Sequence, residues 1–185
     1  MFDTNARLHD ADARALMIRH MQALSGMGYS GFELHIGREP ETDTAFPTYE
    51  EEIQAYSAFR KQLDEAGLHD IQLATNVGGS PGLYPSSPNK HIEAAGLAFL
   101  KSRVDITAAL GGSIMMGPVV YPYGSFIEGV WSDALQDELS RHYAYAAPVI
   151  DELGQHARKQ GVKVAIEPIT HWETPGPNKL SQVIE

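Results

Sequence analysis

The sequence contains no cysteine, which excludes disulfide bonds, thiolate metal sites and a cysteine nucleophile. It also has no apolar run near the roughly 20 residues that a membrane-spanning helix needs. The opening segment, MFDTNARLHD, lacks the basic-then-apolar order of a secretory signal, so we expect a cytoplasmic protein that does not bind membranes. A formal net charge of -10, without any run of lysine or arginine, would repel a phosphate backbone, so nucleic acid is not an expected partner.

The order of apolar segments indicates the fold class. Hydrophobic residues make up 43% of the 185 residues, enough for one globular domain with a hydrophobic core. Helical and strand periodicities alternate, as a parallel sheet with crossover helices requires. Short apolar stretches predict four strands, at residues 31–36, 71–77, 113–120 and 162–169. Right-handed crossovers would place these strands side by side and parallel.

Helix signals fill the intervals between the strands. Thr48 and Glu51 have the spacing of a capping box, and Gly67 ends the helix that follows them. Ser132 is the expected N-cap of a later helix that contains Pro148. Proline inside a helix predicts a kink, or two helices that meet there.

Two architectures use this alternation. A doubly wound sheet would carry a G-x-G-x-x-G phosphate turn after its first strand, and none follows the strand predicted at 31–36. A (β/α)8 barrel has eight strands and roughly 250 residues, more than this chain provides. Because the sequence begins and ends with helical patterns, we expect an α/β fold. It would be a partial TIM barrel forming one domain over 1–185, without the first strand and about the last three of the eight.

Polar residues follow the predicted strands at their C-terminal ends, where parallel barrels build active sites. They are Glu33 and His35, Asn76, Tyr121 and Tyr123, and the segment from Glu167 to Glu173. Glu167 is the most informative, because mostly apolar residues lead directly to it. A carboxylate there must be paired, metal-bound or protonated to offset its desolvation. On position alone, pairing with a neighbouring lysine or arginine explains Glu167 equally well, and solvation explains Glu173.

The residues around Glu167 also resemble a known family. IEPITHWET, with Glu-Pro after a strand and a second glutamate six residues later, resembles the sugar phosphate isomerase/epimerase superfamily with the xylose isomerase-like barrel. Within it, the segment is most similar to the ketose 3-epimerases. GGSIMMGPVVYPYG resembles their fourth-strand segment, SSPNKHIEAAGLAFLKSRVDITAALGG the helix before it, and GYSGFELHIG their second strand. The resemblance covers nearly the whole chain.

The resemblance implies a role for each glutamate. Glu167 matches a glutamate that binds a divalent ion, Mn²⁺ or Mg²⁺ and sometimes Co²⁺, and moves the proton next to the substrate carbonyl. Glu173 matches a glutamate that hydrogen-bonds the sugar. Oxygen ligands suit these cations, and a Lewis acid on the carbonyl would stabilise an enediolate. The implied activity is isomerisation or epimerisation of a ketose or ketose phosphate in carbohydrate metabolism, with a small-molecule sugar as partner.

The chain departs from the family pattern in two respects. Thr170, His171 and Trp172 stand where the epimerases commonly have Asn-Arg-Phe. The remaining metal ligands of the family, an aspartate, a histidine and a second glutamate, come from later strands that these residues do not include. We therefore expect the 185 residues alone to be inactive, and whether they act as an enzyme is left open.

Other polar residues at the strand exits could line a sugar pocket. His35 and His171 lie there, and Tyr121, Tyr123 and Trp172 could form an apolar wall against a sugar ring or cover the barrel mouth. The other histidines have no paired spacing and are expected at the surface or in packing: His9, His20, His69, His91, His142 and His156.

Three alternatives remain beside the isomerase or epimerase. An inosose dehydratase-like lyase would use similar metal chemistry to expel water. A barrel endonuclease for abasic DNA would need a histidine-rich trinuclear zinc site, and the acidic charge disfavours it. A truncated, non-catalytic barrel could act as a binding or scaffold protein and form a homo-oligomer by pairing its open sheet edges with a second copy.

Overall fold

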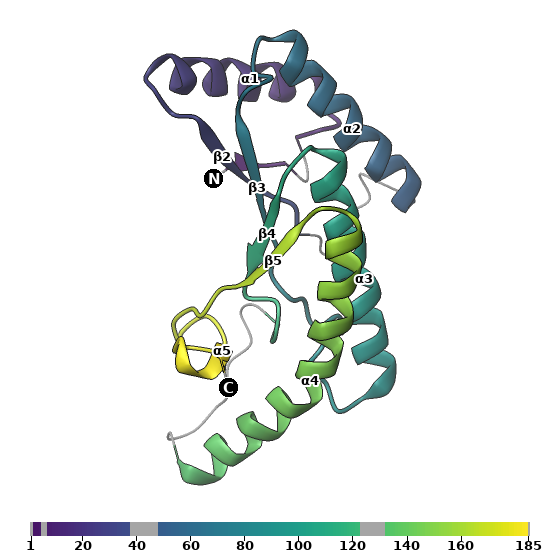
Figure 1. Ribbon diagram of the computed structural model, residues 1–185, viewed down its shortest axis with the longest axis vertical. Coiled ribbons are helices and arrows are strands. Elements are labelled where there is room, and N and C mark those ends of the chain that lie inside the picture. Colours follow the sequence, from purple (N-terminus) through teal and green to yellow (C-terminus); the bar gives the residue numbers. More distant parts are fainter. Residues whose placement is uncertain (1, 5–6, 38–47, 123–131, 185) are drawn as a thin grey trace.

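The computed structural model describes residues 2–4, 7–37, 48–122 and 132–184, and its centre is one parallel sheet with helices along it (Figure 1). The strands are β1 (Phe2–Asp3), β2 (Gly31–His35), β3 (Gln72–Asn76), β4 (Ile114–Gly117) and β5 (Lys163–Ile166). Each pairs in parallel with the next, in the order β1-β2-β3-β4-β5. The predicted parallel sheet of a partial barrel is confirmed.

Strand β1 corrects one detail of the prediction. We expected the first strand to be missing, but Phe2 and Asp3 pair with Leu34 and His35 of β2. Two residues are too few to show an alternating pattern, so no periodicity marks this strand in the sequence. The described residues thus form five strands, against eight in a complete (β/α)8 barrel.

The helices are α1 (Ala11–Gly26), α2 (Tyr49–Glu65), α3 (Lys90–Ala109), α4 (Asp133–Lys159) and α5 (Ser181–Ile184). Two of the helices begin at the N-caps that the sequence predicts, Thr48 for α2 and Ser132 for α4. At the start of α2, the Thr48 hydroxyl accepts from the amide of Glu51 at 3.2 Å, and the Glu51 carboxylate accepts from the amide of Thr48 at 3.0 Å. Helix α4 continues through Pro148 as one helix, and Figure 1 shows that it bends. Within the described ranges, no helix has the length and apolarity needed to cross a bilayer.

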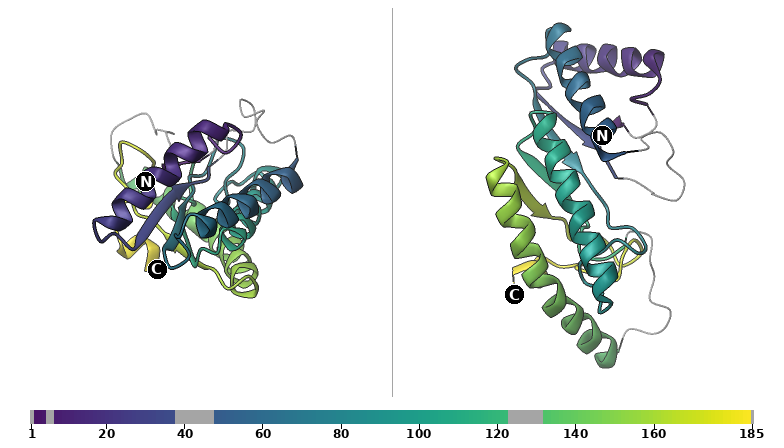
Figure 2. Two further views of the ribbon diagram at one scale, coloured as in Figure 1. Left: turned by 90° about the horizontal axis from the view of Figure 1, so that it is seen from above. Right: turned by 90° about the vertical axis from the view of Figure 1, so that its right-hand side faces the viewer.

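The two faces of the sheet differ in burial. Helices α2, α3 and α4 lie on one side of it (Figures 1 and 2), and strand residues on that side, such as Leu34, Thr75 and Met115, are fully buried. The main core joins these strands to the helices through Phe59, Leu63, Leu100, Val104 and Leu153. Residues that alternate with the buried ones, such as Glu33 and Met116, remain partly exposed. The strands therefore present a second, more accessible face on which ligand-binding side chains can lie.

Candidate active site at the strand exits

Glu167 lies directly after β5, at the C-terminal edge of the sheet. Its amide donates to the carbonyl of Gly117 at 3.0 Å, which extends the pairing of β5 with β4 by one step. Alternation along the strand places Glu167 on the same face as Ala165, opposite Ile166, which packs against the core. Among the described residues, no side chain forms a hydrogen bond or ion pair with the Glu167 carboxylate. Glu167 is half-buried at the strand exit. Because no described side chain binds its carboxylate, the carboxylate is available to a ligand.

Strand register brings further polar residues to the same face. His35 pairs with Asn76, which pairs with Met116, and Met116 pairs with Ala165. These four residues form one row across the accessible face, and Glu167 lies two residues beyond its end. The Asn76 amide donates to the Glu33 carboxylate at 3.0 Å, so the exits of β2 and β3 also share a polar contact. The structure therefore places His35 and Glu167 on one face and at one edge of the sheet.

The loop after β5 carries three of the predicted sugar contacts. The Thr170 hydroxyl donates to the carboxylate of Glu173 at 2.9 Å, and Glu173 is half-buried. Trp172 is 72% exposed, and its ring lies 4.5 Å from that of His171. Asn178 closes the loop, because its amide donates to the carbonyls of Ile169 at 2.7 Å and Thr174 at 3.1 Å. Glu173 thus lies inside a loop with internal hydrogen bonds, and the two aromatic rings lie on its surface.

Tyr121 occupies a different environment from the one expected of a pocket wall. It is only 6% exposed, and its ring stacks on His142 at 5.5 Å and meets Tyr143 edge-on at 6.2 Å. Burial raises the pKa of Tyr121 above its usual range and that of Tyr143 to about 12. Both hydroxyl oxygens are buried, and neither has a hydrogen-bond partner in the part of the chain that the structure describes. Tyr121 therefore packs against α4, and Tyr123 lies outside the described residues.

Two glycines allow the exits of β3 and β4 to pack backbone against backbone. Gly117 has φ +144, and a Cβ there would collide with the Val77 carbonyl. A Cβ on Gly79 would lie 2.6 Å from the carbonyl oxygen of Tyr121. Only glycine fits both positions without a shift of the chain. As a turn signal, glycine did not predict this close approach, for which the Gly-Pro pair after an apolar strand is the available cue in the sequence.

The described residues do not form a complete metal site. They contain no group of three or more histidine, aspartate or glutamate side chains placed to hold a metal ion. A divalent cation of the Mg²⁺ or Mn²⁺ type takes about six ligands, several of them protein or substrate oxygens. Glu167 can supply one such oxygen, but the described part of the chain does not provide a full donor set.

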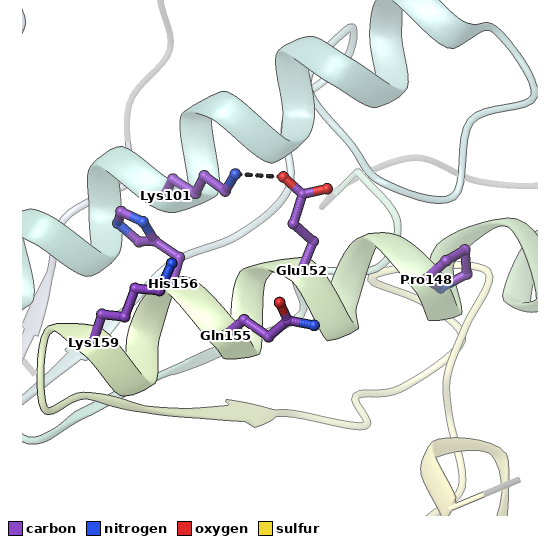
Figure 3. A pocket seen from close by; sticks show the side chains of 6 residues that line it. All are labelled: Lys101, Pro148, Glu152, Gln155, His156 and Lys159. Carbon is purple, nitrogen blue, oxygen red and sulfur yellow. Dashed lines mark hydrogen bonds and ion pairs between the residues drawn. The ribbon is translucent and has the colours of Figure 1, made fainter.

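A polar groove exists elsewhere, on the helical layer (Figure 3). It lies between α3 and α4, has a volume of about 490 Å³ and is lined by Lys101, Pro148, Glu152, Gln155, His156 and Lys159. Lys101 donates to Glu152 across it at 2.6 Å. None of the residues predicted to contact sugar lines this groove, so it is separate from the strand exits.

Comparison with solved structures connects this geometry to known proteins. A protein from Anabaena variabilis, provisionally described as a sugar phosphate isomerase/epimerase, is 46% identical, with a TM-score of 0.89 over 99% of this chain and 57% of its own. A D-allulose 3-epimerase from Methylomonas sp. has 18% identity and a TM-score of 0.66, over 92% of this chain and 51% of its own. An L-ribulose 3-epimerase has 17% identity and a TM-score of 0.68, over 94% of this chain and 50% of its own. The two epimerases show a shared fold.

The chain spans between half and three-fifths of the length of these three proteins. No protein of curated function gives a significant match. The family model described as the xylose isomerase-like TIM barrel matches residues 21–185, most of the sequence. The chain therefore belongs to the xylose isomerase-like TIM barrel family.

Proposed function

We propose that this chain forms part of a sugar isomerase or epimerase that acts on a ketose or ketose phosphate, with Glu167 as the group that transfers the proton. One observation carries the proposal: Glu167 follows β5 on the accessible face of the sheet, and no side chain of the described residues occupies its carboxylate. Active sites of parallel barrels lie at this edge. The 46% identity with the Anabaena variabilis protein supports the same class of reaction.

The proposed step is a proton transfer next to a carbonyl. The Glu167 carboxylate takes a proton from the carbon beside the carbonyl carbon of the ketose. The electron pair of the broken C–H bond forms a C=C bond, and the carbonyl electrons move to oxygen, which gives an enediolate. Delivery of a proton to the opposite face of that carbon, by a second acid on that face, re-forms the carbonyl and completes an epimerisation. In an isomerisation, the proton instead goes to the former carbonyl carbon, and the hydroxyl proton of the first carbon passes to the former carbonyl oxygen, so that the carbonyl forms at the first carbon.

Five residues are the proposed sugar contacts. Glu173 and His171 offer polar atoms, Trp172 offers an exposed aromatic face, and His35 lies on the same face of the sheet as Glu167. Tyr121 completes the proposed set, although its ring packs against α4. Exposed aromatic rings beside carboxylates suit a sugar, which has both C–H faces and hydroxyl groups.

The same proposal includes a divalent ion, Mn²⁺ or Mg²⁺, with Co²⁺ as a further candidate. Glu167 would be one of its ligands. The described residues do not complete the donor set, so the ion's other ligands would have to come from outside them.

A chimaera tests the proposal. The 185 residues would be joined to the part of the Anabaena variabilis protein that they do not match, so that the barrel is completed. With Mn²⁺ and a panel of ketoses and ketose phosphates, we expect the chimaera to produce an epimer or isomer. Glu167→Gln should lower kcat by about 10²-fold or more, since the amide cannot accept the proton.

Several results would contradict the proposal. A folded chimaera that turns over no ketose excludes the activity, and full turnover by Glu167→Gln excludes the role of Glu167. A product that has lost one water relative to the substrate would favour the inosose dehydratase-like alternative. The 185-residue chain, assayed in parallel, should be inactive if ligands from beyond the described residues are required.

A further inference from the structure

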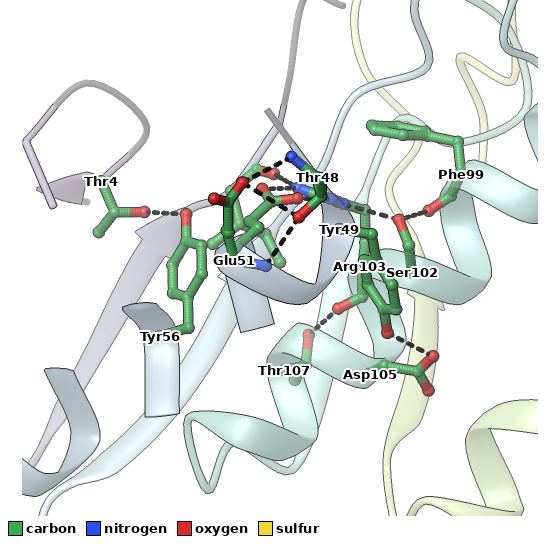
Figure 4. Close-up of polar contacts among 12 residues, drawn as sticks. Thr4, Thr48, Tyr49, Glu51, Tyr56, Phe99, Ser102, Arg103, Asp105 and Thr107 are labelled. Atoms are coloured by element: carbon green, nitrogen blue, oxygen red, sulfur yellow. Dashed lines mark hydrogen bonds and ion pairs between the residues drawn. The ribbon is translucent and has the colours of Figure 1, made fainter. Parts of the chain in front are cut away.

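A buried hydrogen-bond chain reaches the backbone where β2 ends (Figure 4). The Thr4 hydroxyl donates to the carbonyl of His35 at 2.7 Å, and the Thr4 amide donates to the same oxygen at 3.2 Å. The Tyr56 hydroxyl on α2 lies 2.9 Å from that of Thr4. Because the Thr4 hydroxyl has only one proton, which it gives to His35, Tyr56 must be the donor to Thr4. Helix α2 is therefore connected to the His35 backbone through Thr4.

A buried ion pair reaches the next carbonyl. Arg103 on α3 and Glu52 on α2 are 2% and 1% exposed, and they form a two-pronged pair in which one contact measures 2.5 Å. The guanidinium also donates to the carbonyl of Ile36 at 3.1 Å. Its Nε donates to Ser102, and the group lies 5.1 Å from the centre of the Phe99 ring. Arg103 thus has little freedom to move away from Ile36.

The Ile36 amide completes the set of fixed backbone groups, since it donates to the carbonyl of Asn76 at 3.0 Å. Glu52 and Tyr56 are four residues apart on α2, so one face of a single helix supports both chains of contacts. A buried ion pair is weak evidence for stability, because an apolar pair of similar volume is often at least as stable. The contribution of this pair is to geometry. Arg103 holds the Ile36 carbonyl and Thr4 holds the His35 carbonyl, so two consecutive carbonyls have fixed positions at the C-terminal end of β2.

The position of the His35 ring depends on the path of this backbone. A Cβ on Gly37 would lie 2.8 Å from His35 Nε2 and 3.0 Å from Cε1, so the ring lies close over the chain that leaves β2. We propose that Thr4, Glu52, Tyr56 and Arg103, here called the β2 clamp, are positioning residues that set the place of the His35 imidazole at the mouth of the sheet. The functional meaning of this position rests on the sugar contact proposed above for His35.

The test uses the isotope-labelled 185-residue protein and the side-chain NMR signals of its eight histidines, with His35 assigned through His35→Gln. Arg103→Lys keeps the positive charge beside Glu52 but removes the fork that also reaches Ile36. Tyr56→Phe removes the donor to Thr4. Both variants should shift or broaden the His35 signal. They should also speed amide exchange at Ile36 by about tenfold, relative to the Val77 amide at the neighbouring strand exit.

Two further variants give the controls. Thr107→Val removes a buried hydrogen bond to the backbone carbonyl of Arg103 at 2.8 Å and another with the Thr75 hydroxyl at 2.7 Å. It leaves every side-chain contact of the β2 clamp in place. It should leave the His35 signal unchanged. Gly37→Ala should move the His35 signal directly, because the new methyl group occupies the place of the ring.

Neither readout needs a substrate, so these outcomes test the β2 clamp independently of the proposed catalytic role of Glu167. A His35 signal that stays in place in Tyr56→Phe and Arg103→Lys overturns the β2 clamp, and so does an equal shift in Thr107→Val. Should Arg103→Lys fail to fold, Tyr56→Phe still decides. A shifted His35 signal together with an inactive chimaera would keep the β2 clamp and remove the proposed function.

Discussion

The exits of β2 and β5 lie at the same edge of one sheet but are built in opposite ways. At β2, the carbonyls of His35 and Ile36 both have buried partners, from Thr4 and from Arg103. At β5, the amide of Glu167 is bonded to Gly117, whereas its carboxylate has no side-chain partner among the described residues. The β2 exit thus has two carbonyls held by buried side chains, whereas the β5 exit has a carboxylate, that of Glu167, available to a ligand.

This difference is informative about how a binding site is assembled. A ligand-binding group must be held in place by its surroundings while its own polar atoms stay available. In this fold, the fixed geometry at β2 comes from helices α2 and α3, and the available carboxylate comes from β5. Each part can be altered alone, which allows the two contributions to be separated by mutation.

The largest expected effect is at the β2 exit. Arg103→Met leaves the Glu52 carboxylate buried and without its cation, and should lower the free energy of unfolding by about 3–5 kcal/mol. Urea denaturation followed by circular dichroism measures the loss. Changing both residues, in Glu52→Leu with Arg103→Met, should recover part of it, because no charge is then left buried. The Ile36 carbonyl would still lack its donor.

An exposed ion pair is the matched control for this prediction. Lys101 and Glu152 also join two helices at 2.6 Å, but their side chains are 30% and 58% exposed. Lys101→Met should therefore cost less than about 1 kcal/mol. Equal losses in Arg103→Met and Lys101→Met would mean that water reaches Glu52 and that the β2 exit is not rigidly held.

The next effect concerns Gly117, whose carbonyl accepts from the Glu167 amide. Gly117→Ala places a methyl group against the Val77 carbonyl at a φ of +144, and should cost about 2–3 kcal/mol. Gly154→Ala is the control, because Gly154 lies inside α4 with nothing within 4 Å of the added Cβ. That change should stabilise the protein by about 0.5–1 kcal/mol. Thermal unfolding of both variants compares a required glycine with a dispensable one, and similar melting temperatures would contradict the close approach.

The contrast between the exits also shows what the sequence could predict. Local signals were sufficient for the capping box at Thr48, for β2 to β5 and for Glu167 at a strand exit, because each depends on residues close together in the chain. Glu52 follows Glu50 and Glu51, and such a run is typical of an exposed first turn of a helix. Its burial depends on how α2 packs against α3, which brings it to a partner 51 positions away. No local pattern contains that information.

The candidate site divides in the same way. The order of residues predicts that Glu167, His35 and Tyr121 lie at strand exits. In the structure, His35 is the last residue of β2, Glu167 directly follows β5, and Tyr121 lies four residues after β4 ends at Gly117. The direction in which a loop folds after a strand is set by distant packing, and for this reason Tyr121 is buried against His142 and Tyr143. Strand β1 was missed because two residues carry no period, although they pair with β2.

A smaller loss is expected at Tyr56, the other helical support of β2. Tyr56→Phe removes a hydroxyl from a side chain that is fully buried, and should cost about 1 kcal/mol, the usual size for one hydrogen bond. Thr4 still donates to His35, so the strand exit should weaken without separating. Tyr145→Phe, at a side chain that is 41% exposed, should leave the melting temperature unchanged. If the Tyr56→Phe protein were as stable as the unmodified chain, the hydrogen bond between Tyr56 and Thr4 would not help to hold the β2 exit.

The smallest expected effect comes from the same chemical change made on both sides of the comparison. Glu167→Gln keeps the shape of the side chain and breaks no described side-chain contact, so the free energy of unfolding should change by less than about 0.5 kcal/mol. Glu52→Gln leaves the Arg103 cation buried and unpaired, and should cost about 3 kcal/mol or more. If Glu167→Gln instead cost more than about 1 kcal/mol in urea denaturation, its carboxylate would be holding the fold together. A carboxylate with that structural task would not be available to accept a proton from a sugar, because the groups that stabilise its charge would already be in place.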